Sequence, residues 1–174
     1  NLGANVSSTG TQTYTGAVTL SANVTLTSSG DVITFSNTVN SADSTNRNLT
    51  VTTGGDTVHI NFDGIVGGSQ GLGAIAITGV LDLNAAIADA NSLTVSGASL
   101  LDADVTTSGT QTYSGAITLG TAARTLEGST VTTRGTLTGA YALTVTGNAV
   151  FGNSSGDDVV LTGTNKALAV SGTT

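Results

Sequence analysis

The sequence predicts an all-β protein, namely a right-handed parallel β-helix (a β-solenoid) that spans residues 1–174. Apolar and threonine side chains alternate along most of the chain, similar segments return at short intervals, and strong helix formers are scarce. The chain has 34 threonines and 18 serines, no proline and no cysteine, and 9% of its residues are charged. Because proline cannot donate a strand hydrogen bond, its absence suits strands that pair on both sides.

The clearest alternation runs through residues 11–27. Apolar side chains stand at even positions between Tyr14 and Leu26, and threonines stand at odd positions between Thr11 and Thr27. Successive side chains of a strand point to opposite faces, so one face is expected to be buried and the other to be a row of threonines. The same pattern returns around residues 33–35, 49–51, 58–62, 75–77, 81–83, 93–95, 117–119, 143–145 and 168–170, and clusters of Gly, Asn, Asp and Ser between these stretches predict turns.

Two repeats are visible. Residues 2–20 and 101–119 are identical at twelve of 19 positions, at an offset of 99. A shorter unit of the Leu-Thr-Val type begins at Leu49, Leu93, Leu143 and Leu168, with spacings of 44, 50 and 25 residues. We interpret these spacings as two, two and one coils of 22–25 residues. A coil of this size cannot bury its apolar face alone and must stack on its neighbours, so we expect seven to nine coils in a rod about 40 Å long.

A different fold remains open at this stage. The interval of 99 residues is also the size of an immunoglobulin-like domain, so two tandem β-sandwiches are the alternative. The shorter spacing favours the solenoid, and right-handed crossovers are the general rule for parallel strands.

Charge and composition exclude several classes of partner. The formal net charge is −7, and the four cationic residues are scattered, so nucleic acid and anionic membrane surfaces are not expected to bind. No apolar run is long enough to span a bilayer as a helix. The absence of cysteine excludes a disulfide framework and is compatible with an extracellular location.

The sequence resembles the long repeats of giant bacterial surface and secreted adhesins, of the filamentous-haemagglutinin and autotransporter-passenger type. The segments that carry the resemblance are Gly-Thr-Gln-Thr-Tyr-Thr-Gly-Ala-Val-Thr-Leu at residues 10–20, its copy at 109–119, Asp-Val-Ile-Thr-Phe at 31–35 and the recurring Leu-Thr-Val-Thr-Gly. The resemblance implies an exported β-helical stalk used in adhesion, aggregation or a surface filament. It also leads us to expect a segment of a longer chain.

Few residues could carry out chemistry. His59 is the only histidine and alternation places it on the outer face, and Glu127 is the only glutamate, so no catalytic triad or zinc site is expected.

Aspartates could in principle act in pairs, and the carboxylate groupings are Asp102 with Asp104, Asp157 with Asp158, and Asp56 with Asp63. Only the first pair shares a strand face, which suggests a weak Ca²⁺ site at Asp102 and Asp104, although the first repeat copy has Gly3 and Asn5 there. The glycine-rich residues 64–73 contain no lysine and predict a wide turn, not a phosphate loop.

Four other residues are assigned a structural role. Gln12 and Tyr14 share parity, as do Gln111 and Tyr113 at the equivalent places of the second copy. We expect these side chains to point inward and to hydrogen-bond along the stack, since a buried amide without partners is costly.

The expected function is structural and non-catalytic: an extracellular stalk or filament without a cofactor, whose partners are further copies of itself and surface glycans. Two alternatives stay open. One is a carbohydrate-active β-helix, such as a polysaccharide lyase or hydrolase. The other is an ice-binding solenoid whose face would consist of Thr11-x-Thr13-x-Thr15, Thr50-x-Thr52 and Thr144-x-Thr146.

Overall fold

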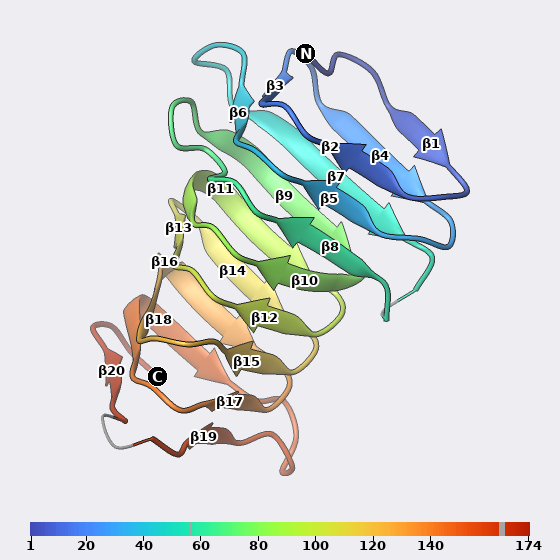
Figure 1. The fold of residues 1–174 in the computed structure, drawn as a ribbon. Helices are drawn as coiled ribbons and strands as arrows, with labels where there is room; N and C mark the ends of the chain where they lie inside the picture. The colour runs from blue at the N-terminus through green and yellow to red at the C-terminus, as the bar shows by residue number, and fades with distance from the viewer. Residues whose placement is uncertain (56, 164–165) are drawn as a thin grey trace.

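The computed structural model describes residues 1–55, 57–163 and 166–174, and all the regular secondary structure in these ranges is β-strand. The strands pair in parallel from coil to coil and form a β-solenoid of about eight turns, consistent with a right-handed parallel β-helix (Figure 1). The predicted fold is therefore confirmed. The alternative of two β-sandwiches is wrong, because a sandwich of that type is built from antiparallel pairs. No helix in the described ranges is long and apolar enough to cross a membrane.

Each coil has three sides, which we call faces A, B and C. Face A contains β1 (Val6–Ser8), β4 (Val24–Ser28), β7 (Arg47–Thr53), β9 (Leu72–Thr78), β14 (Thr110–Tyr113) and the second parts of β11 (Ile87–Val95), β16 (Arg124–Thr133) and β18 (Leu143–Phe151). Face B contains β2 (Gln12–Tyr14), β5 (Ile33–Phe35), β8 (His59–Phe62), β10 (Val80–Leu83), β12 (Ser99–Leu101), β15 (Ile117–Leu119), β17 (Leu137–Gly139) and β19 (Val159–Leu161).

Face C is the least regular side. It contains β3 (Val18–Leu20), β6 (Val39–Ser41), β13 (Val105–Thr107), β20 (Leu168–Val170), the isolated bridge residues Leu2 and Val66, and the first parts of β11, β16 and β18. The registers of β11 and β16 shift where these strands turn the corner from face C to face A, between Ile87 and Ala90 and between Glu127 and Thr130. The strand predicted around residues 81–83 is confirmed by β10.

The core is a set of ladders in which like side chains stack from coil to coil. Inside face B, the ring of Phe35 stacks between the rings of Tyr14 and Phe62, with centroids 5.1 and 4.8 Å apart and interplanar angles of 13° and 2°. The same column continues in leucines, through Leu83, Leu101 and Leu119. Apart from the half-buried Tyr14 of the first coil, these interior residues are buried, because neighbouring coils cover them.

The coils differ in length more than the sequence predicts. Val95 pairs with Tyr113 across one coil, whereas Ile33 pairs with Ile60 across another coil that is half as long again. The additional residues lie in loops at the corners, so the paired strands keep their register.

The interpretation of the Leu-Thr-Val spacings as two, two and one coils is wrong for the second spacing, from Leu93 to Leu143. Leu93 lies on face A and Leu143 on face C, so the interval between them is not a whole number of coils.

The longer repeat is also out of phase with the coils. In the first copy β1 lies on face A and β2 on face B, whereas the equivalent β13 and β14 lie on faces C and A. The offset between the two copies is therefore one face short of five coils. The same sequence accordingly folds in the same way on two different sides of the solenoid.

Removing the central ring of the aromatic stack should be costly. Phe35→Ala is expected to lower the free energy of unfolding by about 3–5 kcal/mol, because Phe35 is fully buried and both ring contacts are lost. Urea denaturation measures the change. Phe151→Ala is the matched control, since Phe151 is only partly buried, and its loss should be smaller. Equal losses in the two variants would contradict the role of the stack.

Candidate functional site

A glutamine and a tyrosine join two coils at the first repeat copy. Gln12 is buried, and its Nε2 donates to the carbonyl oxygen of Thr27 on the next coil at 2.7 Å and to the Ser8 Oγ at 3.1 Å. The Tyr14 hydroxyl donates to the Gln12 Oε1 at 2.8 Å. The amide is therefore partnered at both ends, which removes the cost of burying it.

The second copy repeats these contacts on another face. The Gln111 Nε2 donates to the Glu127 carbonyl at 2.7 Å and to the Val105 carbonyl at 3.1 Å, and the Tyr113 hydroxyl donates to the Gln111 Oε1 at 3.0 Å. Thr107 takes the place of Ser8, with its Oγ1 3.4 Å from the Gln111 Nε2. In both copies the glutamine reaches the next coil, and the tyrosine on the same strand holds the glutamine; three of the four side chains are buried and Tyr14 is half-buried.

Burial acts on the two tyrosines to different degrees. Tyr113 is fully buried and Tyr14 is half-buried, and desolvation raises the pKa of each phenol above its ordinary value. The Tyr113 hydroxyl is therefore held in its neutral, hydrogen-donating form.

Tyr113→Phe should lower the free energy of unfolding by about 1–2 kcal/mol, because it leaves the buried Gln111 Oε1 without its donor. Tyr14→Phe should cost less, since water can reach the half-buried Tyr14. A raised pKa in the folded state means that wild-type stability is retained up to about pH 10 and falls above it. The loss above about pH 10 should be smaller in Tyr113→Phe. Urea midpoints at neutral and alkaline pH test both statements, and equal effects of the two variants would contradict them.

Asparagine and aspartate side chains form a second set of links, which the sequence analysis did not identify. In each case the side-chain Oδ1 accepts a backbone N–H from the following coil, at 2.8–3.0 Å. The pairs of acceptor and donor are Asn5 with Thr25, Asn23 with Asn48, Asn48 with Ala74, Asp104 with Thr125, and Asn148 with Thr173. The signal in the sequence is an Asn or Asp directly before a Val or Leu strand, as in Asn23-Val24 and Asn48-Leu49.

The predicted calcium ligands take part in such links. The Asp102 Oδ1 accepts the Thr121 N–H at 3.1 Å, and the Asp104 Oδ1 accepts the Thr125 N–H at 2.9 Å. Within residues 1–55, 57–163 and 166–174, no group of three or more His, Asp or Glu side chains is arranged to hold a metal ion. Calcium binding at Asp102 and Asp104 stays a prediction.

His59, Asp63 and Asp157 make separate contacts in the fold. His59 is on the outer side of face B, and its Nδ1 lies 2.6 Å from the Asp82 Oδ2. Asp63 accepts a hydrogen bond from the Asn84 amide at 2.8 Å, and its predicted partner Asp56 falls outside the described residues. The Asp157 carboxylate accepts the N–H groups of Asn153 and Ser154 within its own turn, which lowers its pKa.

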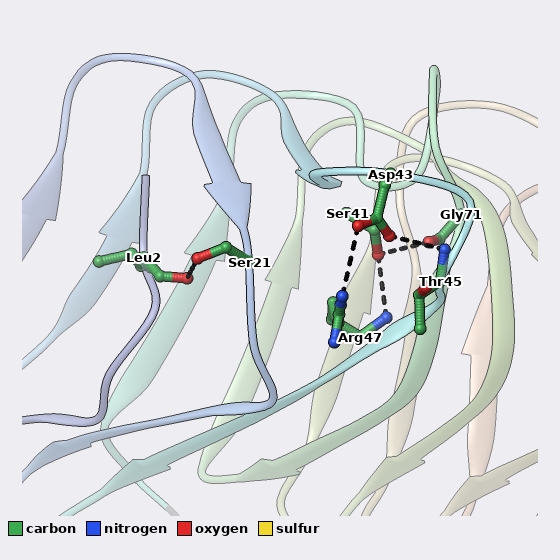
Figure 2. A network of polar contacts seen from close by, with 7 residues as sticks. All are labelled: Leu2, Ser21, Ser41, Asp43, Thr45, Arg47 and Gly71. Carbon is green, nitrogen blue, oxygen red and sulfur yellow. Dashed lines mark hydrogen bonds and ion pairs between the residues drawn. The ribbon is translucent and has the colours of Figure 1, made fainter.

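Ser41, the last residue of β6, links its own corner loop to the next coil (Figure 2). The Ser41 Oγ accepts the Arg47 N–H at 3.0 Å and donates to the Gly71 carbonyl at 2.7 Å. The Asp43 carboxylate accepts the Thr45 N–H, which is the main reason for its lowered pKa, and it pairs with the Arg47 Nη2 at 3.4 Å. Gly71 lies within the glycine-rich residues 64–73, for which the sequence predicts a wide turn. The chain bends at Gly64 and at residues 67–70 but not throughout, because Val66 pairs with the neighbouring coils and β9 begins at Leu72.

Threonines form two columns on the outer side of face A. One column contains Thr25, Thr50, Ala76, Thr94, Thr112 and Thr132, and the other, two residues along each strand, contains Thr27, Thr52 and Thr78. Neighbouring members lie about 4.8 Å apart, the spacing of paired strands. The three motifs proposed for an ice-binding face do not share one surface. Thr50 and Thr52 lie on face A, whereas Thr13 lies on face B and Thr144 on face C.

Both ends of the solenoid leave core positions uncovered. At the first coil, Leu2, Val6 and Tyr14 are only partly buried. At the last coil, Leu168 is 43% exposed, whereas Leu143 beneath it is 0% exposed. An open hollow at this end is lined by Val159, Leu161, Lys166, Ala167 and Leu168.

Comparisons of this chain with protein-family models, with curated proteins and with solved structures find no significant match.

Proposed function

We propose that this chain is a structural, non-catalytic segment of an extracellular adhesin or surface filament, in which it acts as a rigid β-helical stalk. The observation that supports this function most directly is the continuity of the links along the axis. Backbone pairing runs through every coil, and the Gln–Tyr and Asn/Asp links add side-chain hydrogen bonds between coils at several heights. Such a rod transmits load without relying on a hinge.

The outer surface suits the same role. It is rich in threonine and poor in charge, so it can hydrogen-bond to water, to surface glycans or to neighbouring rods. Several carboxylates cap turns or link coils, which supports a structural use of the acidic residues. Further copies of the same chain are the expected partners along the axis.

Rigidity can be measured between the two ends of face B. Thr13 and Val160 are exposed on β2 and β19, and the native chain has no cysteine, so Thr13→Cys and Val160→Cys accept one spin label each. Seven strand intervals separate the two positions, so pulsed electron paramagnetic resonance should give a narrow distribution of label-to-label distances centred at about 34 Å. A broad distribution under native conditions would exclude a stalk. Release of products from acidic polysaccharides in the presence of Ca²⁺ would instead favour the carbohydrate-active alternative.

A second candidate function is binding of ordered water at an ice surface, and the threonine columns of face A are the observation that favours it. They present methyl and hydroxyl groups at a regular spacing over several coils.

Thermal hysteresis tests this candidate. If face A binds ice, Thr94→Lys should reduce the hysteresis severalfold, because it places a charged side chain within the first column. Thr144→Lys, on the outer side of face C, is the matched control and should leave it unchanged. The absence of hysteresis in the wild-type chain, or equal effects of both variants, would rule the candidate out.

A further inference from the structure

The two ends of the chain match an internal segment when they are joined. Residues 168–174 followed directly by residues 1–20 align without a gap with residues 93–119, and 16 of the 27 positions are identical. The interval from Leu168 across the junction to Leu2 equals the interval from Leu93 to Leu101. The internal segment therefore shows how the last coil of one copy and the first coil of another can pack.

The exposed core residues at the last coil have buried internal counterparts. Leu168 is 43% exposed and Val170 is partly buried, whereas their counterparts Leu93 and Val95 are both 0% exposed. Leu93 and Val95 are covered by Gln111 and Tyr113 of the next coil. By the alignment, Gln12 and Tyr14 of a second copy would cover Leu168 and Val170.

A glycine at the first coil, Gly16, gives further support for this packing. A Cβ added to Gly16 would meet nothing within 4 Å, and Gly16 does not have a positive φ, so this chain on its own gives no steric reason for glycine there. A Cβ on its counterpart Gly115 would lie 2.5 Å from the backbone of Gly97 on the preceding coil. The counterpart of Gly97 in the last coil is Gly172. The absence of a side chain at Gly16 is thus explained if it packs on Gly172 of another copy.

We propose that a second copy of this chain docks head-to-tail, with its first coil on the last coil of the first copy, rotated by one face about the solenoid axis. Gln12, Thr13 and Tyr14 of the second copy then pair with Leu168, Ala169 and Val170, as Gln111, Thr112 and Tyr113 pair with Leu93, Thr94 and Val95. The rotation follows because β2 lies on face B and β20 on face C. It is tolerated because the same motif already folds on both face B and face A.

In the docked register, backbone pairing between the two open strand edges supplies the attraction between the copies. The proposal rests on the stalk function proposed above, to which it adds the partner and the register.

Disulfide cross-linking tests the register. Strands that pair lie about 4.8 Å apart, which suits a disulfide, so the double variant Thr13→Cys with Ala169→Cys should form ladders of covalent multimers on mild oxidation. The control is Thr13→Cys with Val160→Cys, which would cross-link only if the second copy were not rotated. Ladders at least tenfold weaker in the control are the expected result. Equal or stronger ladders in the control, efficient dimers of Thr13→Cys alone, or no ladders in either double variant would overturn the proposal.

A steric variant separates docking from folding. Gly16→Val should reduce ladder formation at least tenfold in the Thr13→Cys, Ala169→Cys background while leaving the urea midpoint unchanged, because a Cβ at position 16 meets no atom of its own chain within 4 Å beyond the adjoining residues. Unchanged ladders in Gly16→Val would also overturn the proposal. The spin-label distance within one copy does not depend on docking, so a rigid rod that fails to cross-link would refute the junction and leave the stalk function standing.

Discussion

Parallel backbone pairing between coils is the constraint on which this structure depends. Each strand has donors and acceptors on both edges, and only another coil of similar shape can satisfy them. This requirement explains the absence of proline, the ladders of like side chains and the tolerance of different coil lengths. One coil can be half as long again as another because the added residues lie in loops at the corners, whereas the paired strands stay in register.

Side-chain links supplement the backbone where the chain turns. Gln12 and Gln111 reach the next coil from inside the solenoid, and Asn23 and Asn48 reach it from the corner between faces C and A. Both kinds of link add a side-chain hydrogen bond to a backbone group of the next coil. A buried amide is costly alone, but here its donor and acceptor atoms are both partnered.

Much of this architecture could be predicted from the sequence, because alternation along a strand and repetition between coils are both local patterns. The inward positions of Gln12 and Tyr14 follow from their parity with Val18 and Leu20. The phase of the coils could not be predicted in this way. Leu93 and Leu143 begin similar motifs but lie on different faces, since the loop lengths between them decide where each strand falls. The roles of Asp102 and Asp104 as acceptors were hidden for the same reason, because their donors Thr121 and Thr125 lie one coil away.

The shift between the two long repeats bears on how such a protein can change in length over evolution. If the sequence of one copy folds equally well on faces A and B, the unit that can be duplicated or deleted is a single strand with its turn, and not a whole coil. An insertion need not contain complete coils, because the chain that follows it can continue on the next face of the solenoid. A gene that encodes a solenoid of this kind can therefore recombine at many more breakpoints than one whose repeats are locked to complete turns.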